Sequence, residues 1–299
     1  MGRYAKNNLI EILKKEYSRY HTSLLPNNDL YPLHRLDRLT SGVLLISKNK
    51  ETARDFSIAL RSKQIGKQYL ALVNGICNME GVFKVDYPLI EVDPLLGIWK
   101  SIHSDESKEY IKSHYLNDTP LDWNNAKHAE TLFQVLHKDH ASNQTVLLCQ
   151  PVSFSTNLVN QTLKITGRTH QIREHLHAIG HQIVGDVCED GDRTSTSEWQ
   201  ERAFKMWRWK LENMVKHGFG TKELLNAAVN EIILKMDYTP PESLGLFSIR
   251  YKYKDLKFEC EIYRPDWIDP FWKDIQYGMK QSELYKTFEL YGQPSPSEN

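Results

Sequence analysis

The chain has 299 residues, and its 38 basic residues balance 38 acidic ones to a formal net charge of zero. A chain of this length can bury a substantial core and can hold one large domain or two modest ones. The zero net charge excludes the globally basic composition of many nucleic-acid-binding proteins, although local basic faces stay compatible with binding a polyanion.

The cysteines and the apolar stretches narrow the class of protein further. The cysteines are scattered without a C-x-x-C pair, so we expect neither a zinc knuckle nor a thioredoxin-like site, and no metal or other cofactor. We find no signal core at the N-terminus and no apolar stretch long enough to span a bilayer. We therefore expect reduced thiols and no membrane, with the cytoplasm, the nucleus and the mitochondrion open as compartments.

The first predicted element is an amphipathic helix over residues 7–17, on which Leu9, Ile12 and Leu13 recur at helical spacing. Proline, asparagine and aspartate then cluster at 26–29, which indicates a loop. This loop leads toward the first stretch of the chain that carries a distinctive chemistry.

That stretch is HRLDRLTSG at residues 34–42. It places one carboxylate, Asp37, between the guanidinium groups of Arg35 and Arg38, and neighbouring cations favour the ionised form of a carboxylate. The apolar run at 43–46 predicts a short buried strand. Asp37 should therefore lie on a loop before a core strand, either as a structural turn residue paired with arginine or as a reactive carboxylate.

A helix capped by Asn49 is expected next, and a strand follows at 67–73. In this strand Tyr69 and Ala71 share one side, while Leu70 faces the other. The outer face of the helix and the chain after it are basic, which suits a polyanion. The basic side chains of this region are Lys50, Arg54, Arg61, Lys63 and Lys67.

Residues 78–128 read as loops with short strands. Two strands at 129–135 and 146–149 are expected to pair with each other. A further strand at 160–166 should lead directly into the second distinctive stretch of the chain.

The second distinctive stretch is GRTHQIREHLH at residues 167–177. Thr169 is the predicted N-cap of a helix, and Gly180 its predicted end. Arg168 and His170 would stand at the helix start, where backbone N–H groups and the helix dipole favour an anion. The histidines of this region do not predict a metal site, because no standard ligand spacing occurs.

The last third of the chain contains two further expected helices, at 197–217 and 221–236. A hairpin should follow, with strands at 247–253 and 258–263 around a turn at Asp255-Leu256. The tail after residue 293 is expected to be disordered. Together these elements predict an α+β fold with a mixed, largely antiparallel sheet, flanking helices and a helical insertion.

Three stretches resemble, in the same order, the motifs of the RluA-type pseudouridine synthases. They are HRLDRLTSG at 34–42, KQYLALVNG at 67–75 and GRTHQIREHL at 167–176. The resemblance covers residues 1–185 and returns weakly at 246–267. It implies the pseudouridine synthase fold.

The resemblance also implies roles for individual residues. Asp37 would be the catalytic carboxylate, Tyr69 would lie against the target base, and Arg173 would pair with Asp37. Arg35 looks like the arginine that enters the RNA as the target base leaves the stack. The residues expected to bind RNA are Arg35, Arg38, Arg54, Arg61, Lys67, Arg168 and His170.

On this basis we expect a catalytic domain at 1–185 and 246–272, without the strand that usually begins this fold. A helical insertion at 186–245 and a C-terminal helix with a disordered tail at 273–299 complete the chain. The implied activity is the isomerisation of uridine in structured RNA by a monomer that needs no cofactor. The opening residues are similar to eukaryotic members and no S4-like domain is found, so tRNA is the first expected substrate and rRNA the second.

Other classes fit the residues less well. A glycosidase would need a second carboxylate beside Asp37, and a zinc nucleobase deaminase would need a P-C-x-x-C segment. The motif around Asp37 contains no second acidic residue, and the chain contains no such cysteine pair. A non-catalytic RNA-binding protein with this fold stays open as the alternative.

Overall fold

The computed structural model describes residues 9–20, 29–37, 39–62, 64–93, 98–116, 120–154, 163–164, 168–186, 244–253, 256–260 and 265–288. An eight-stranded sheet forms the centre, and all its ladders are antiparallel except one. This confirms the α+β class with a largely antiparallel sheet. In spatial order the strands are β12 (Leu256–Glu259), β11 (Leu246–Tyr253), β4 (Gly66–Asn74), β9 (Gln144–Phe154), β8 (Glu130–Asp139) and β5 (Val82–Val85), while β10 (Leu163–Lys164) pairs with β9 and β2 (Ser41–Gly42) pairs with β11.

The two faces of the sheet are covered by different helices, because side chains alternate along each strand. Ala71 of β4 packs in one core cluster with Leu176 of α4 (Gln171–Ala178). Leu70 of the same strand packs in a second cluster with Ile275 of α7 (Trp272–Gln281) and Leu284 of α8 (Glu283–Thr287). The predicted alternation along β4 is thus confirmed, and the sheet forms the middle of a three-layer core. A short 3₁₀ helix, Asp269–Phe271, precedes α7.

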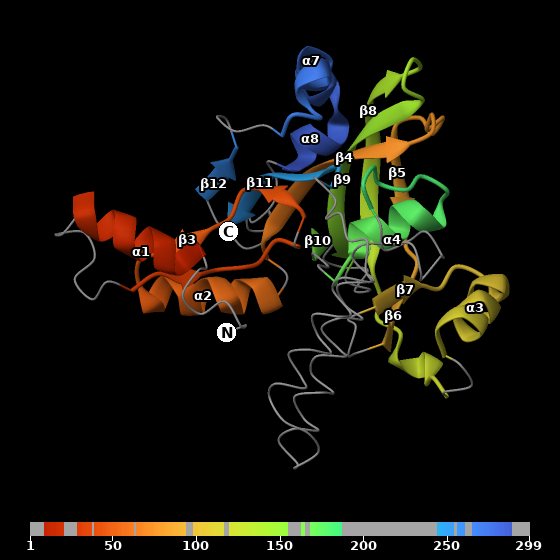
Figure 1. Ribbon diagram of the computed structural model, residues 1–299, viewed down its shortest axis with the longest axis horizontal. Helices are drawn as coiled ribbons and strands as arrows, with labels where there is room; N and C mark the ends of the chain where they lie inside the picture. The colour runs from red at the N-terminus through yellow and green to blue at the C-terminus, as the bar shows by residue number, and fades with distance from the viewer. Residues whose placement is uncertain are drawn as a thin grey trace, which may run out of the picture.

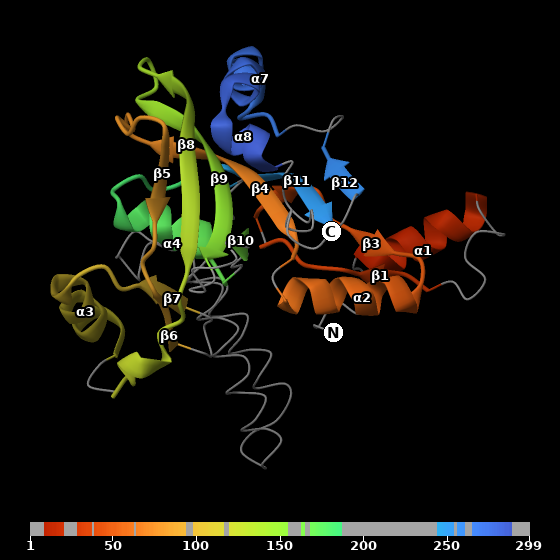
Figure 2. The ribbon, with the colours of Figure 1, turned by 180° about the vertical axis from the view of Figure 1, so that it is seen from behind.

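The N-terminal elements form one end of the molecule (Figures 1 and 2). They are α1 (Leu9–Tyr20), β1 (Tyr31–Pro32), β3 (Ile46–Ser47) and α2 (Lys50–Arg61). Asn49 caps α2 as predicted, because its side chain accepts a hydrogen bond from the Thr52 amide at 2.7 Å. Phe56 of α2 is buried beside Tyr253 of β11, so this end is attached to the sheet through β11.

A small lobe lies at the opposite end of the molecule (Figures 1 and 2). It comprises β6 (Leu89–Asp93), β7 (Ile98–Ser101), α3 (Asp105–Ile111), a π-helical turn at Lys112–Leu116 and a 3₁₀ turn at Trp123–Asn125. Helix α3 was not predicted, and it begins with a capping box formed by Ser104 and Ser107. The lobe is joined to α4 inside the protein: the Lys100 ammonium lies 3.4 Å from Glu174, and the Ser101 amide donates to the same carboxylate at 3.2 Å.

The run at 43–46 is not the single buried strand that its composition predicts. The chain instead makes two short pairings, β2 with β11 and β3 with β1, and crosses between them. Gly42 has a φ of 113°, and a Cβ there would lie 2.1 Å from the Ser248 carbonyl oxygen. The glycine is therefore required by the close parallel pairing with β11.

Two other predicted boundaries change. The strand after β11 begins at Leu256 rather than Phe258, because Tyr253 pairs with Leu256 across a tight hairpin. The pair predicted at 129–135 and 146–149 is confirmed, although both strands are longer. The helices expected at 197–217 and 221–236 and the tail after residue 293 lie outside the described residues. Within the part of the chain that the structure describes, no helix is both long and apolar enough to cross a bilayer.

Candidate active site

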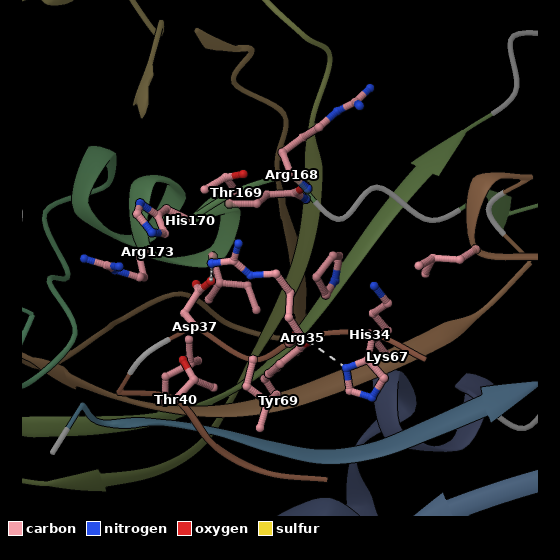
Figure 3. Close-up of a pocket in the computed structure, with 16 residues that line it drawn as sticks. His34, Arg35, Asp37, Thr40, Lys67, Tyr69, Arg168, Thr169, His170 and Arg173 are labelled. Atoms are coloured by element: carbon pink, nitrogen blue, oxygen red, sulfur yellow. Dashed lines mark hydrogen bonds and ion pairs between the residues drawn. The ribbon is translucent and has the colours of Figure 1, made fainter. Parts of the chain in front are cut away.

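A cavity of about 260 Å³ lies where the Asp37 loop, strand β4 and the start of α4 meet (Figure 3). These three segments carry the three motifs that are distant in the sequence. Most of the predicted site residues line this cavity: Arg35, Asp37, Lys67, Tyr69, Arg168, His170 and Arg173. Arg54 and Arg61 do not line it and lie exposed on α2, while Arg38 lies outside the described residues.

Asp37 is positioned by its own turn. Its carbonyl oxygen accepts a hydrogen bond from the Thr40 amide at 3.0 Å, which closes the turn after the carboxylate. Arg35 faces the carboxylate with 4.0 Å between Nη2 and Oδ1, and its side chain is 84% exposed against 27% for Asp37 (Figure 3). Such a long, exposed pair contributes little stability and leaves both groups able to meet a ligand.

The expected contact between Arg173 and Asp37 is wrong for this structure. Arg173 binds Asp186 instead: its Nε donates to Oδ2 at 2.7 Å and its Nη2 donates to Oδ1. In Figure 3 its guanidinium points away from Asp37. The two side chains are only 4% and 1% exposed, and this two-pronged geometry is the one that a guanidinium and a carboxylate favour.

Lys67 and His34 share the cavity with Asp37. Burial lowers the pKa of the Lys67 ammonium to about 8, so the charge is less stable here than in water. Burial also lowers the pKa of His34 to about 4, and the positive charge of Lys67 adds to this effect. At neutral pH the cavity therefore holds a neutral imidazole next to a cationic amine.

Tyr69 projects from β4 into the cavity. Its hydroxyl lies 3.2 Å from the hydroxyl of Tyr251 on the neighbouring strand β11. Burial raises the pKa of the Tyr69 phenol well above its ordinary value. Tyr69 is therefore a neutral phenol at physiological pH, able to donate a hydrogen bond to a bound base but not present as a phenolate.

The start of α4 differs from the prediction. The helix begins at Gln171, and His170 occupies the N-cap position in the left-handed region with a φ of 56° and without a side-chain capping bond. Gln171 fixes this turn, because its Oε1 accepts from the Arg168 amide at 3.0 Å and its Nε2 donates to the Glu130 carbonyl at 2.7 Å. Thr169 is thus not the cap, although Arg168 and His170 both stand beside the cavity as expected.

Three other polar residues of the cavity have roles that the sequence did not predict. Gln171 holds the turn described above, and His34 holds the Asp37 loop by accepting the Leu45 amide at 3.0 Å. The Thr40 hydroxyl is buried beside Asp37 without a partner among the described residues. His34 and Thr40 lie inside the motif at residues 34–42, so their place in the sequence could have indicated that they belong to the site. Nowhere in the described ranges do three His, Cys, Asp or Glu side chains gather to hold a metal ion.

Comparisons with known proteins identify the family of this chain. The family described as "RNA pseudouridylate synthase" matches residues 9–178. The "tRNA pseudouridine(31) synthase" of Saccharomyces cerevisiae is 25% identical over 294 residues, which cover 89% of this chain and 63% of the yeast protein. Human "Pseudouridylate synthase RPUSD2" is 31% identical over 185 residues, or 62% of this chain and 26% of the human protein.

A solved structure, "Human RNA Pseudouridylate Synthase Domain Containing 1", shares the fold with a TM-score of 0.51 and 18% identity, covering 96% of this chain and 89% of that one. The two sequence relatives are both longer than the part that this chain matches. The family match spans more than half of the chain and includes the Asp37 loop, strand β4 and all of α4. The chain therefore belongs to the RNA pseudouridylate synthase family, as its three RluA-type motifs predicted.

Proposed function

We propose that this protein is an RNA pseudouridine synthase that acts on tRNA and uses Asp37 as its catalytic carboxylate. One observation carries the proposal: the partly exposed carboxylate of Asp37, together with a neutral phenol and a cationic amine that both come from strand β4, lines one cavity. Its size suits a single nucleobase better than a folded partner. The name of the yeast relative supports tRNA as the first substrate class.

The reaction needs only a few groups. The bond from the ribose C1′ to N1 of uracil breaks, the base turns, C1′ bonds to C5, the C5 proton leaves, and N1 takes up a proton. No electrons are gained or lost overall. Asp37 begins the reaction either by attacking C1′ or by removing the 2′ proton, and both routes need the carboxylate ionised and facing the sugar.

Tyr69 and Lys67 act on the base in this proposal. The phenol of Tyr69 supports the detached uracil and donates a hydrogen bond to it. The ammonium of Lys67 stabilises negative charge on the uracil after the C1′–N1 bond breaks, because a partly buried cation acts strongly on nearby charge. Arg173 supports the site through Asp186 rather than by touching Asp37.

The RNA approaches over a basic edge. Leu60, near the end of α2, lines the cavity, so the basic outer face of α2 adjoins the rim. Arg35 is the most exposed charged group at this rim and is placed to fill the gap left by the flipped base. Arg168 and His170 contact backbone phosphates on the other side of the cavity.

The test is a release assay with tRNA transcripts that carry tritium at C5 of uridine. Wild-type protein is expected to release tritium, while Asp37→Asn, close in shape but uncharged, should release none and still bind the tRNA. Asp105→Asn is the matched control, since this exposed carboxylate lies in the distant lobe. Turnover near the wild-type rate in Asp37→Asn would refute the assignment. Activity on rRNA fragments but not on tRNA would show that the substrate is rRNA and not tRNA.

A further inference from the structure

We infer that Tyr251 is a positioning residue for Tyr69, at the centre of a hydrogen-bond chain that starts at the Leu45 backbone amide, passes through His34 and ends on the Tyr69 hydroxyl. The catalytic part of this inference rests on the proposed function. Tyr251 does not line the cavity and is 1% exposed, so it acts on the reaction only through its neighbours.

The chain is continuous in space although its members come from separate segments. The Leu45 amide lies 3.0 Å from Nε2 of His34, and Nδ1 of His34 lies 3.3 Å from the Tyr251 hydroxyl. The Tyr251 hydroxyl lies 3.2 Å from that of Tyr69. The imidazole also stacks on the Tyr251 ring, with 4.3 Å between ring centroids and 25° between planes. The loop of Asp37 and the strand of Tyr69 are thereby joined through β11.

The direction of the chain follows from its first bond. A backbone N–H can only donate, so Nε2 of His34 accepts and carries no hydrogen. The imidazole is neutral, because burial lowers its pKa to about 4, and its one hydrogen therefore sits on Nδ1. Nδ1 then donates to Tyr251 or to the Arg35 carbonyl, which is 3.4 Å away, and cannot accept from either.

The direction determines what Tyr69 can do. Since Tyr251 cannot donate to His34, its hydrogen is free to point at the Tyr69 oxygen. The Tyr69 oxygen then accepts from Tyr251, and Tyr69 keeps its own hydrogen for the bound base. The phenol of Tyr69 is thereby oriented as a donor before RNA arrives, which is the benefit of a preorganised site.

The chain does not conduct protons. For Tyr69 to pass a proton to His34 through Tyr251, Nδ1 would have to lose its hydrogen and accept another. That change would place a hydrogen on Nε2, where it would face the Leu45 N–H. The C5 proton of uracil therefore leaves through the cavity and not through Tyr251.

Tyr251→Phe tests the inference, because it keeps the ring on His34 and removes one oxygen. We expect the single-turnover rate to fall by about 3- to 10-fold, the effect of one ordinary hydrogen bond, with tRNA affinity unchanged. Tyr253→Phe, two residues along the same strand, is the matched control and should leave the rate unchanged. In a Tyr69→Phe background, Tyr251→Phe should have no further effect. An equal effect in both backgrounds would show that Tyr251 acts on the fold in general and would overturn the inference.

A second measurement does not depend on activity. The nitrogen chemical shifts of His34 in the full-length protein should show a protonated Nδ1 and an unprotonated Nε2 at pH 7, and Tyr251→Phe should speed exchange of the Nδ1 hydrogen. The opposite tautomer, or an imidazolium at pH 7, would refute the chain even if the enzyme is active. Conversely, an inactive wild-type protein with the expected tautomer would refute the proposed function and leave the chain established.

Discussion

Arg173→Lys separates two roles for this arginine, as the partner of Asp186 or as the partner of Asp37. The arginine binds Asp186 through two donors, and both side chains are almost fully buried. Lysine keeps the charge but cannot make two parallel bonds from one planar group. Breaking a buried ion pair costs about 3–5 kcal/mol, and we expect the lower end of this range because a cation remains.

Urea unfolding at pH 7 measures this loss, and a single-turnover assay on tRNA measures the effect on chemistry. We expect the unfolding free energy to fall by about 3 kcal/mol and the rate of the folded fraction to fall moderately. Arg168→Lys is the control for stability, since within the described residues the Arg168 side chain makes one long hydrogen bond of 3.4 Å, to the His128 carbonyl. If Arg173→Lys changes the unfolding free energy by less than about 1 kcal/mol and abolishes turnover, Asp186 is not its essential partner and the reasoning fails.

Three further predictions concern charge. Lys67→Met should stabilise the folded protein at pH 7 by about 3 kcal/mol while weakening tRNA binding, since burial disfavours the charged form of Lys67 below its pKa of about 8. This cost of the wild-type lysine should disappear as the pH rises from about 8 toward 10.5, which unfolding at pH 7 and pH 10 would reveal. Burial lowers the pKa of His175 to about 4, so on acidification the unfolded chain takes up a proton before the folded protein does. The unfolding free energy should therefore fall by about 3 kcal/mol from this group between pH 6.5 and pH 4. His175→Gln should flatten this pH profile of stability, and an unchanged profile would contradict the prediction. Neutralising Arg54 and Arg61 together should weaken tRNA binding. The slope of log affinity against log salt should become shallower by about 1.4, because each single-strand phosphate contact contributes about 0.7. An unchanged slope would show that the RNA binds another surface.

The sequence was sufficient for the parts of the structure that local pattern determines. Alternation along β4, the Asn49 cap and the existence of helix α4 were all predicted, because each depends on spacing within a few residues. The three RluA-type motifs also predicted which segments would share a cavity.

The remainder depended on contacts that no local pattern encodes. Arg173 binds Asp186, thirteen residues later, because the chain turns back after α4 and brings that carboxylate to the guanidinium. Helix α3 was missed because it is short and its cap uses Ser107 where a glutamate or glutamine is usual. No role for Tyr251 followed from the sequence, since only the pairing of β11 with β4 places its hydroxyl next to that of Tyr69.

The link between the small lobe and α4 limits how far this protein could be shortened. Glu174 is 1% exposed on the helix that lines the cavity, and the lobe supplies it with the Lys100 ammonium and the Ser101 amide. A truncated version lacking residues 89–128 would lose both donors and keep the carboxylate, whose charge is costly to bury without them. The lobe is therefore part of the smallest unit that can hold the first turn of α4 in place, and a minimal enzyme built from the central sheet alone would have to replace Glu174 as well.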